Sequence, residues 1–164
     1  MADFVHLHVH SHYSLLNGLP KVKALVKTAK KQGFKAIALT DYGSMYGAIE
    51  FYQACLAEEI KPIIGFEAFL VPVGRTRFDK DPSQDGAVSN IILLAENYQG
   101  YRNLMLLSSA GHLEGFFNEK PRVDLELLQK YHEGIIALSG PVEGRVPALI
   151  LKGDYDGAKA AAIE

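Results

Sequence analysis

The sequence is poor in the residues that build small cross-linked or metal-stapled domains, with a single cysteine, Cys55, and no tryptophan in 164 residues. One thiol excludes an intrachain disulfide and any zinc module made of several cysteines. Because Cys55 lies in the helical pattern AIEFYQACLAEE, we expect a small buried thiol there rather than a nucleophile.

Long apolar runs are also missing. No stretch approaches the roughly 18 apolar residues that indicate a membrane span, and the N-terminus MADFVHLH lacks the basic-then-apolar layout of a signal peptide. We therefore expect a cytoplasmic protein with no membrane partner.

Basic charge is not in excess, since the formal net charge is −2. An autonomous DNA-binding domain has a basic surplus, so any nucleic-acid role has to be local or come from a larger assembly. The content of 48% hydrophobic and 22% charged residues is typical of globular proteins. A chain of this length can form one domain with a sizeable core.

Histidine is what the sequence does have. His6, His8, His10 and His12 alternate in the run HLHVHSH, within a stretch that otherwise predicts a strand from about Phe4 to Val9. Alternate positions of a strand share one face, so the imidazoles are gathered as a metal or phosphate site requires. A purification tag has contiguous histidines, so the interleaved pattern favours a functional origin for His8 and His10.

Helices and strands alternate along the rest of the chain. We expect strands over 36–39, 62–71 with an interruption at Gly65, 90–95 and 134–138, and helices from Pro20 to near Gly33, over 46–58 and 101–109, after an Asp124 N-cap, and at the C-terminal end. Residues 72–89 are predicted to form a loop excursion, and residues 110–122 another loop. A βα repeat predicts an α/β fold with parallel strands and helical crossovers. Five strands and a last helix still running at Glu164 suggest a barrel that is cut short, because an open barrel leaves strand edges unpaired.

Polar residues follow the predicted strands. His8 and His10 end the first strand, Asp41 ends the second, and Glu67 lies in the third, where Gly65 permits a close backbone approach or a bulge. In barrel-like βα folds the chemistry collects at the carboxyl ends of strands. Imidazole nitrogens and carboxylate oxygens suit Zn, Mn or Fe, and such sites can hydrolyse phosphoesters.

Several segments carry a family resemblance: HLHVHSHYSLLNG, ALTDYGSMYGAIEFYQAC, IKPIIGFEAFLVP, GYRNLMLLSSAGHLEGFFNEKPRVD and EGIIALSGPVEGRVPALIL. They resemble the N-terminal PHP (polymerase and histidinol phosphatase) domain of bacterial replicative DNA polymerase III alpha subunits, from about Phe4 to Glu164. The resemblance implies a distorted (β/α)7 barrel, here truncated after about five strands, with residues 1–164 as the PHP domain of a longer DNA-directed DNA polymerase. The implied partners are the Mg-dependent polymerase module of the same chain, a proofreading exonuclease subunit, other replisome subunits, and DNA through the parent enzyme.

The family's metal ligands are only partly kept. His8, His10 and Glu67 match ligands of metal-binding members, and Asp41 is retained beside a lost histidine, where we expect a hydrogen-bonding support rather than a ligand. Four further ligand positions differ, with Asn17 in place of an aspartate, Tyr42 and Asn90 in place of histidines, and Pro141 in place of a cysteine. Amides are weak ligands, a tyrosine ligates only as a phenolate with a pKa near 10, and proline has no donor side chain.

Two hypotheses remain. The first is a PHP domain that is a scaffold and docking domain in DNA replication, with no cofactor and no hydrolytic activity in this segment. The alternative is a metal-dependent phosphoesterase or 3′–5′ proofreading exonuclease that holds Zn or Mn on His8, His10 and Glu67, with His6 or His12 as substitute ligands. A hydrolytic centre generally needs three protein ligands and an open position, and a two-metal centre needs bridging groups as well, which favours the first hypothesis.

Overall fold

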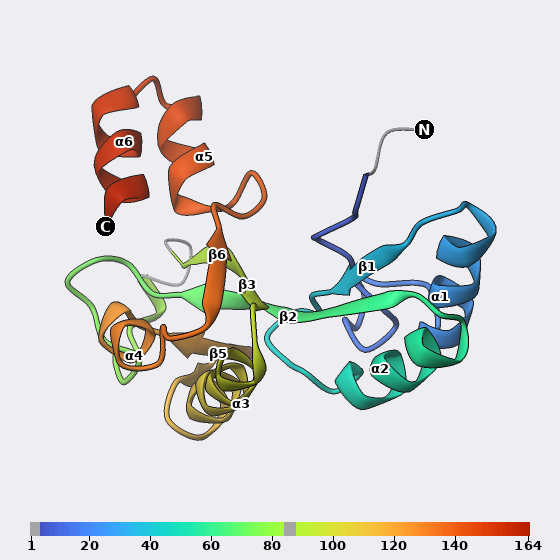
Figure 1. The fold of residues 1–164 in the computed structure, drawn as a ribbon. Helices are drawn as coiled ribbons and strands as arrows, with labels where there is room; N and C mark the ends of the chain where they lie inside the picture. The colour runs from blue at the N-terminus through green and yellow to red at the C-terminus, as the bar shows by residue number, and fades with distance from the viewer. Residues whose placement is uncertain (1–3, 84–87) are drawn as a thin grey trace.

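The computed structural model describes residues 4–83 and 88–164, which form two lobes joined by one long strand (Figure 1). In chain order the elements are α1 (Val22–Lys31), β1 (Ala36–Leu39), α2 (Ala48–Ala57), β2 (Lys61–Leu70), β3 (Ser89–Ala95), α3 (Tyr98–Leu113), β4 (Phe116–Phe117), β5 (Lys120–Val123), α4 (Leu125–Lys130), β6 (Ile135–Leu138), α5 (Arg145–Leu151) and α6 (Tyr155–Ile163). The α/β fold class is confirmed.

Strand β2 organises the sheet. Its first half pairs in parallel with β1, and its last two residues pair in parallel with β5. Its other edge pairs with β3, which in turn pairs with β6, and β4 forms a hairpin with β5. The sheet of the described residues remains open, which is compatible with an incomplete barrel.

The direction of β3 differs from the all-parallel expectation. It runs antiparallel to both β2 and β6, whereas β1, β2, β5 and β6 share one direction. A parallel neighbour needs a long crossover, usually a helix. The described part of the link after β2, residues 71–83 and residue 88, contains no α-helix. Without a crossover, the chain returns along β2 in the opposite direction. Residues 84–87 of the predicted 72–89 excursion lie outside the described residues, and Ser89 already belongs to β3.

The predicted first strand is also corrected. Residues 4–9 are extended but form no regular strand. The backbone N–H groups of Ala38 and Thr40 donate to the carbonyls of His6 and Val9, at 2.9 and 2.8 Å. The step from His6 to Val9 covers three residues, whereas the facing step from Ala38 to Thr40 covers two. The N-terminal segment therefore runs parallel to β1 but does not form a regular hydrogen-bond ladder with it.

Two more predicted boundaries change. Strand β2 is continuous through Gly65, in unbroken register with β3, so the expected interruption is wrong. A Cβ at that position would lie 2.4 Å from the carbonyl oxygen of Leu93, which confirms the close-approach reading. The predicted loop over 110–122 instead contains the end of α3 and the β4–β5 hairpin, whose turn residues Asn118 and Glu119 both have positive φ, 46° and 62°. Such turns favour Asn-Gly pairs. Because this turn has Glu119 in place of glycine, the sequence did not show the usual hairpin pattern.

The core is divided between the two lobes. One cluster packs α1 and α2 against β1 through Val26, Leu39 and Phe51, and the other packs α3 and α4 against β2 and β3 through Phe66 and Leu104. Helices α5 and α6 stand beyond the end of β6 and pack mainly on each other (Figure 1). Strand β2 therefore crosses both cores, which fixes the position of any side chain in its middle.

Candidate metal centre

Glu67 occupies the middle of β2, where its backbone is held on both sides. Its N–H donates to the carbonyl of Asp41 at 3.0 Å, and its own carbonyl accepts from the N–H of Gly43 at 2.8 Å. The loop after β1 thus continues the ladder to an isolated parallel bridge between Tyr42 and Glu67. The Glu67 side chain is 1% exposed, so the fold buries a carboxylate at the junction of the two lobes.

Two histidines from the N-terminal segment contact that carboxylate. The Nε2 atoms of His8 and His10 each lie 2.7 Å from Oε2 of Glu67, and they are 3.2 Å from each other. Since Glu67 is an acceptor when ionised, each imidazole donates its Nε2 hydrogen to it. The alternation that the sequence suggested therefore brings these two rings to one point, even though the segment is not a regular strand.

The charge state of Glu67 follows from its donors. Burial raises the pKa of this carboxyl. Hydrogen bonds from His10, Asn90 and His8 lower the pKa by more than burial raises it, so the pKa lies below its ordinary value. The carboxylate is therefore ionised near neutral pH. It is an anionic ligand that is already in place between two imidazoles.

Asn90 and Tyr42 take up the other oxygen. The Asn90 amide, in β3, donates from Nδ2 to Oε1 of Glu67 at 2.6 Å and to the Tyr42 hydroxyl at 2.8 Å. Burial, the charge of Glu67 and that of Glu143 raise the pKa of Tyr42, and the Asn90 hydrogen bond offsets only part of this. The phenolate that a metal would need is therefore disfavoured.

Asp41 holds the backbone of the histidine segment. Its buried carboxylate accepts from the N–H and the hydroxyl of Ser11, at 2.6 and 2.8 Å, and from the hydroxyl of Ser14 at 2.7 Å. The Ser14 oxygen accepts in turn from the N–H of Tyr42 at 3.0 Å. Asp41 therefore connects the histidine segment to the loop after β1, but its carboxylate forms no hydrogen bond with the side chains of His8, His10 or Glu67. Ser11 and Ser14 were missed by the sequence reasoning, and only their spacing after the histidines could have indicated them.

The remaining predicted positions are separate from the cluster. Asn17 is exposed, and its amide donates only to the carbonyl of Leu15 at 3.3 Å. Pro141 belongs to the loop after β6, where its carbonyl accepts from Gly144, while the N–H of Asn90 contacts the carbonyl of Glu143 at 3.4 Å. That loop therefore packs beside Asn90 and brings the Glu143 charge near Tyr42.

His6 and His12 do not substitute for lost ligands. The ring of His6 packs edge-on against Phe4 and Phe34, with centroids 4.8 and 5.1 Å away, and that of His12 lies 4.3 Å from the Tyr13 ring. Among the described residues, the only group of three or more potential ligands is His8, His10 and Glu67.

The three side chains fit one metal ion. Ligand atoms of a tetrahedral zinc with bonds of about 2.0–2.1 Å lie about 3.3–3.4 Å apart, close to the 3.2 Å between the two imidazole nitrogens. The two contacts to Glu67, at 2.7 Å, would open by roughly 0.6 Å on that same geometry. A second ion would need Oε1 as a bridge, and that oxygen already accepts from Asn90.

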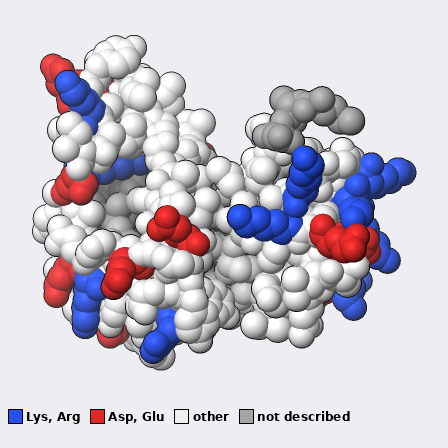
Figure 2. All heavy atoms as spheres, viewed as in Figure 1, with Lys and Arg blue, Asp and Glu red and all other residues white. Residues whose placement is uncertain are grey.

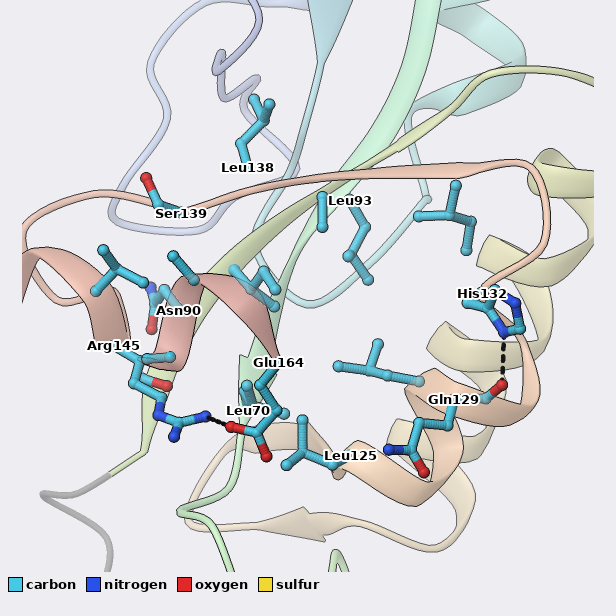
Figure 3. A pocket seen from close by; sticks show the side chains of 18 residues that line it. Leu70, Asn90, Leu93, Leu125, Gln129, His132, Leu138, Ser139, Arg145 and Glu164 are labelled. Carbon is cyan, nitrogen blue, oxygen red and sulfur yellow. Dashed lines mark hydrogen bonds and ion pairs between the residues drawn. The ribbon is translucent and has the colours of Figure 1, made fainter. Parts of the chain in front are cut away.

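Asn90 also lines a cleft that is separate from the cluster of His8, His10 and Glu67. This open cleft has a volume of about 720 Å³ and is lined by β3, β6, α4 and the α5–α6 pair. Figure 3 shows Leu70, Leu93 and Leu125 in its wall, with an ion pair between Arg145 and Glu164 at its rim. Its walls are mainly apolar, which distinguishes it from the cluster of His8, His10 and Glu67.

Comparison with known proteins matches residues 6–164 to the PHP domain family. The chain is 47% identical over 163 residues to DNA polymerase III subunit alpha of Deinococcus radiodurans, covering 96% of this chain and 12% of that protein. It is 50% identical over 152 residues to the same subunit of Treponema pallidum, covering 92% of this chain and 13% of that protein. An amidohydrolase structure from Chromobacterium violaceum has a TM-score of 0.45 at 21% identity, over 65% of this chain and 34% of that one.

Proposed function

Because this chain belongs to the PHP domain family, we propose that it serves as the PHP domain of a bacterial replicative DNA polymerase III alpha subunit. In this proposal it supports DNA replication as a scaffold and docking domain and has no hydrolytic activity of its own. The observation that carries the second half is the Glu67 carboxylate, both of whose oxygens are engaged by protein side chains.

The parentage is supported by the similarity to the alpha subunits. The chain spans only about an eighth of the length of these relatives, so template-directed nucleotidyl transfer with Mg would belong to the rest of a longer chain. The polymerase module of that chain is the first partner we propose. Contacts with an exonuclease subunit, other replisome subunits and DNA are further proposals, as is a cytoplasmic location. In the described part of the chain, no helix combines the length and the apolar character needed to cross a membrane.

The absence of hydrolysis is argued from the donor set. His8, His10 and Glu67 would hold one Zn or Mn ion, which when bound would polarise a phosphoryl oxygen as a Lewis acid. Asn90 keeps Oε1 of Glu67 from bridging to a second ion, and Tyr42 retains its proton. Among the described residues, the cluster therefore offers ligands for one ion and no bridging group for a second.

The test uses the full-length polymerase chain, free of any separate exonuclease subunit. A 3′-labelled single strand is incubated with it in Mn, Zn or Mg buffer, beside a His10→Ala variant. We expect equal, background release of label from both proteins, while both extend a primer. Metal-dependent degradation that disappears in the His10→Ala protein would sink the non-hydrolytic proposal.

The metallophosphoesterase alternative is favoured by one observation, the convergence of three ligands on one point. Elemental analysis of protein purified without chelator separates the two functions. The scaffold proposal expects no more than one equivalent of Zn, Mn or Fe, lost in a Glu67→Gln variant. Two or more equivalents support the alternative.

A further inference from the structure

Helix α1 presents four lysines on its exposed side: Lys23, Lys27, Lys30 and Lys31, called here the lysine band. The opposite side of the helix is buried through Val22, Val26 and Ala29. At 1.5 Å per residue, the band covers about 12 Å of helix axis. Its direction is fixed by the core, because rotation of α1 would expose those apolar side chains.

Few carboxylates neutralise the lysine band. Lys30 lies 3.5 Å from Glu59, and both side chains are largely exposed, so this pair is weak. In the described residues, no carboxylate lies within ion-pair distance of Lys23, Lys27 or Lys31. Glu50 of α2 and Glu58, the residue that caps α2, line a cleft of about 350 Å³ with Lys23 and Lys27, but both lie beyond ion-pair distance of these lysines.

The lysine band itself includes no large exposed apolar side chain. The exposed residues between and after the lysines are small or polar, namely Ala24, Thr28 and Gln32. Protein partners are usually held by buried aromatic or aliphatic anchors, whereas a phosphate backbone is held by charge alone. The composition of this face therefore favours a polyanion such as a nucleic acid over an acidic protein segment.

Charge is also unevenly distributed over the molecule. Residues 4–62 contain seven lysines against four acidic residues, and one of the four, Asp41, is buried. Residues 63–164 contain ten basic and fourteen acidic residues. Figure 2 shows Lys and Arg side chains gathered on the right-hand lobe, which carries α1 and α2. A polyanion is thus attracted to one lobe and repelled by the other.

We propose that the lysine band binds the phosphate backbone of DNA without reading its sequence. One strand carries a phosphate about every 3.4 Å of duplex axis, so the band spans about three or four phosphates. The identification of the polyanion as DNA rests on the proposed function. Lysine suits this role, because its ammonium is a mobile point charge that needs no fixed geometry.

The test compares DNA binding by the full-length chain and by its Lys23→Gln/Lys27→Gln/Lys31→Gln variant. Affinity for a primer–template is measured by fluorescence anisotropy from 50 to 300 mM KCl. Each lost phosphate contact lowers the slope of log K against log salt by about 0.9. We expect the slope to become less steep by about 2 to 3, and the affinity near 100 mM salt to fall at least about tenfold.

Two matched triple variants serve as controls. Lys130→Gln/Lys152→Gln/Lys159→Gln removes the same charge from the other lobe and should keep the original slope. Arginine at positions 23, 27 and 31 keeps the charge and should restore binding. An unchanged slope in the Lys23→Gln/Lys27→Gln/Lys31→Gln variant would overturn the inference, and so would an equal loss of slope in the other-lobe control. The inference would also fail if that lysine-band variant still bound DNA but no longer bound poly-glutamate. Primer extension by the other-lobe control, which changes no residue of the lysine band, shows separately whether the proposed function stands when the inference fails.

Discussion

Two buried carboxylates, Glu67 and Asp124, keep their charge inside the protein. Burial by itself raises the pKa of a carboxyl group, and it does so at both positions. For Asp124 the N–H groups of Arg77 and Leu127 and the Arg77 guanidinium outweigh burial, and the pKa falls below its ordinary value. At the scale of the residue, the number of donors decides the charge state, and burial alone does not.

Asp124 gives the pH-dependent prediction. Its carboxylate accepts from the N–H of Leu127 at 2.9 Å and from Nη1 of Arg77 at 3.0 Å. Because the folded pKa lies below the unfolded value of about 3.9, the ionised group stabilises the fold above that pH, and this contribution is lost as the pH falls through the folded pKa. We expect Asp124→Asn to lower the free energy of unfolding by about 1–3 kcal/mol at pH 7.

The measurement is urea unfolding of the wild-type and Asp124→Asn chains between pH 7 and pH 2.5. The difference between them should shrink on the acid side of about pH 4, where the wild-type carboxyl gains its proton. A difference that stays constant down to pH 2.5 would contradict the assigned direction.

Elements are joined at a few points where only glycine fits. Gly33 ends α1 at φ +81°, and the N–H of Phe34 returns to the carbonyl of Ala29 at 3.0 Å, as a Schellman cap requires. Gly100 lies inside α3, where a Cβ would be 1.8 Å from the carbonyl oxygen of Gly134. The first glycine is needed for its backbone conformation, and the second for the approach of another segment.

These two glycines predict different costs on substitution by alanine. At Gly33 a Cβ meets open space, so Gly33→Ala should cost about 1–2 kcal/mol of left-handed strain. At Gly100 the helix gains about 0.5–1 kcal/mol from alanine, but the backbone clash exceeds this, and a net loss of about 3 kcal/mol or more is expected. Thermal unfolding of both variants should rank Gly100→Ala as the less stable, and the opposite order would refute the packing described for α3.

The described residues form a main hydrophobic cluster in each lobe, a small third cluster of Ala38, Ile92 and Leu94, and an apolar cleft. The cleft of about 720 Å³ between β6, α4 and α5–α6 is lined by leucine side chains of β2, β3 and α4. Apolar surface of this kind marks an interaction site or an aggregation risk. Because the alpha-subunit relatives extend far beyond the matched region, the natural occupant of the cleft need not be present in these 164 residues.

At this scale we expect the isolated 164-residue segment to self-associate and to bind an apolar dye such as ANS. The reason is that the cleft and the open sheet edges stay in contact with water. Light scattering across a tenfold concentration range is the measurement, with the full-length chain as the control. A segment that remains monomeric and binds no dye would show that the cleft is closed in solution.

The local features were readable from the sequence. The pattern of α1 and its Gly33 cap, the Asp124 N-cap and strand β1 depend on residues close together in the chain, and all are confirmed. The alternation of His8 and His10 also predicted that their side chains would meet. These features rest on backbone geometry within a few residues, which a single sequence expresses directly.

The direction of β3, the hairpin over 116–123 and the partners of Glu67 depended on the tertiary structure. Asn90 was identified as a replaced ligand, but only the antiparallel pairing of β3 with β2 turns its amide onto Oε1 of Glu67. Asn17, although next to the histidine run in sequence, is left in solvent. The sequence by itself determined the α/β class, the family resemblance and the surviving ligands. Which donors reach one buried carboxylate was decided by contacts between segments far apart in the chain, and no local pattern encodes those contacts.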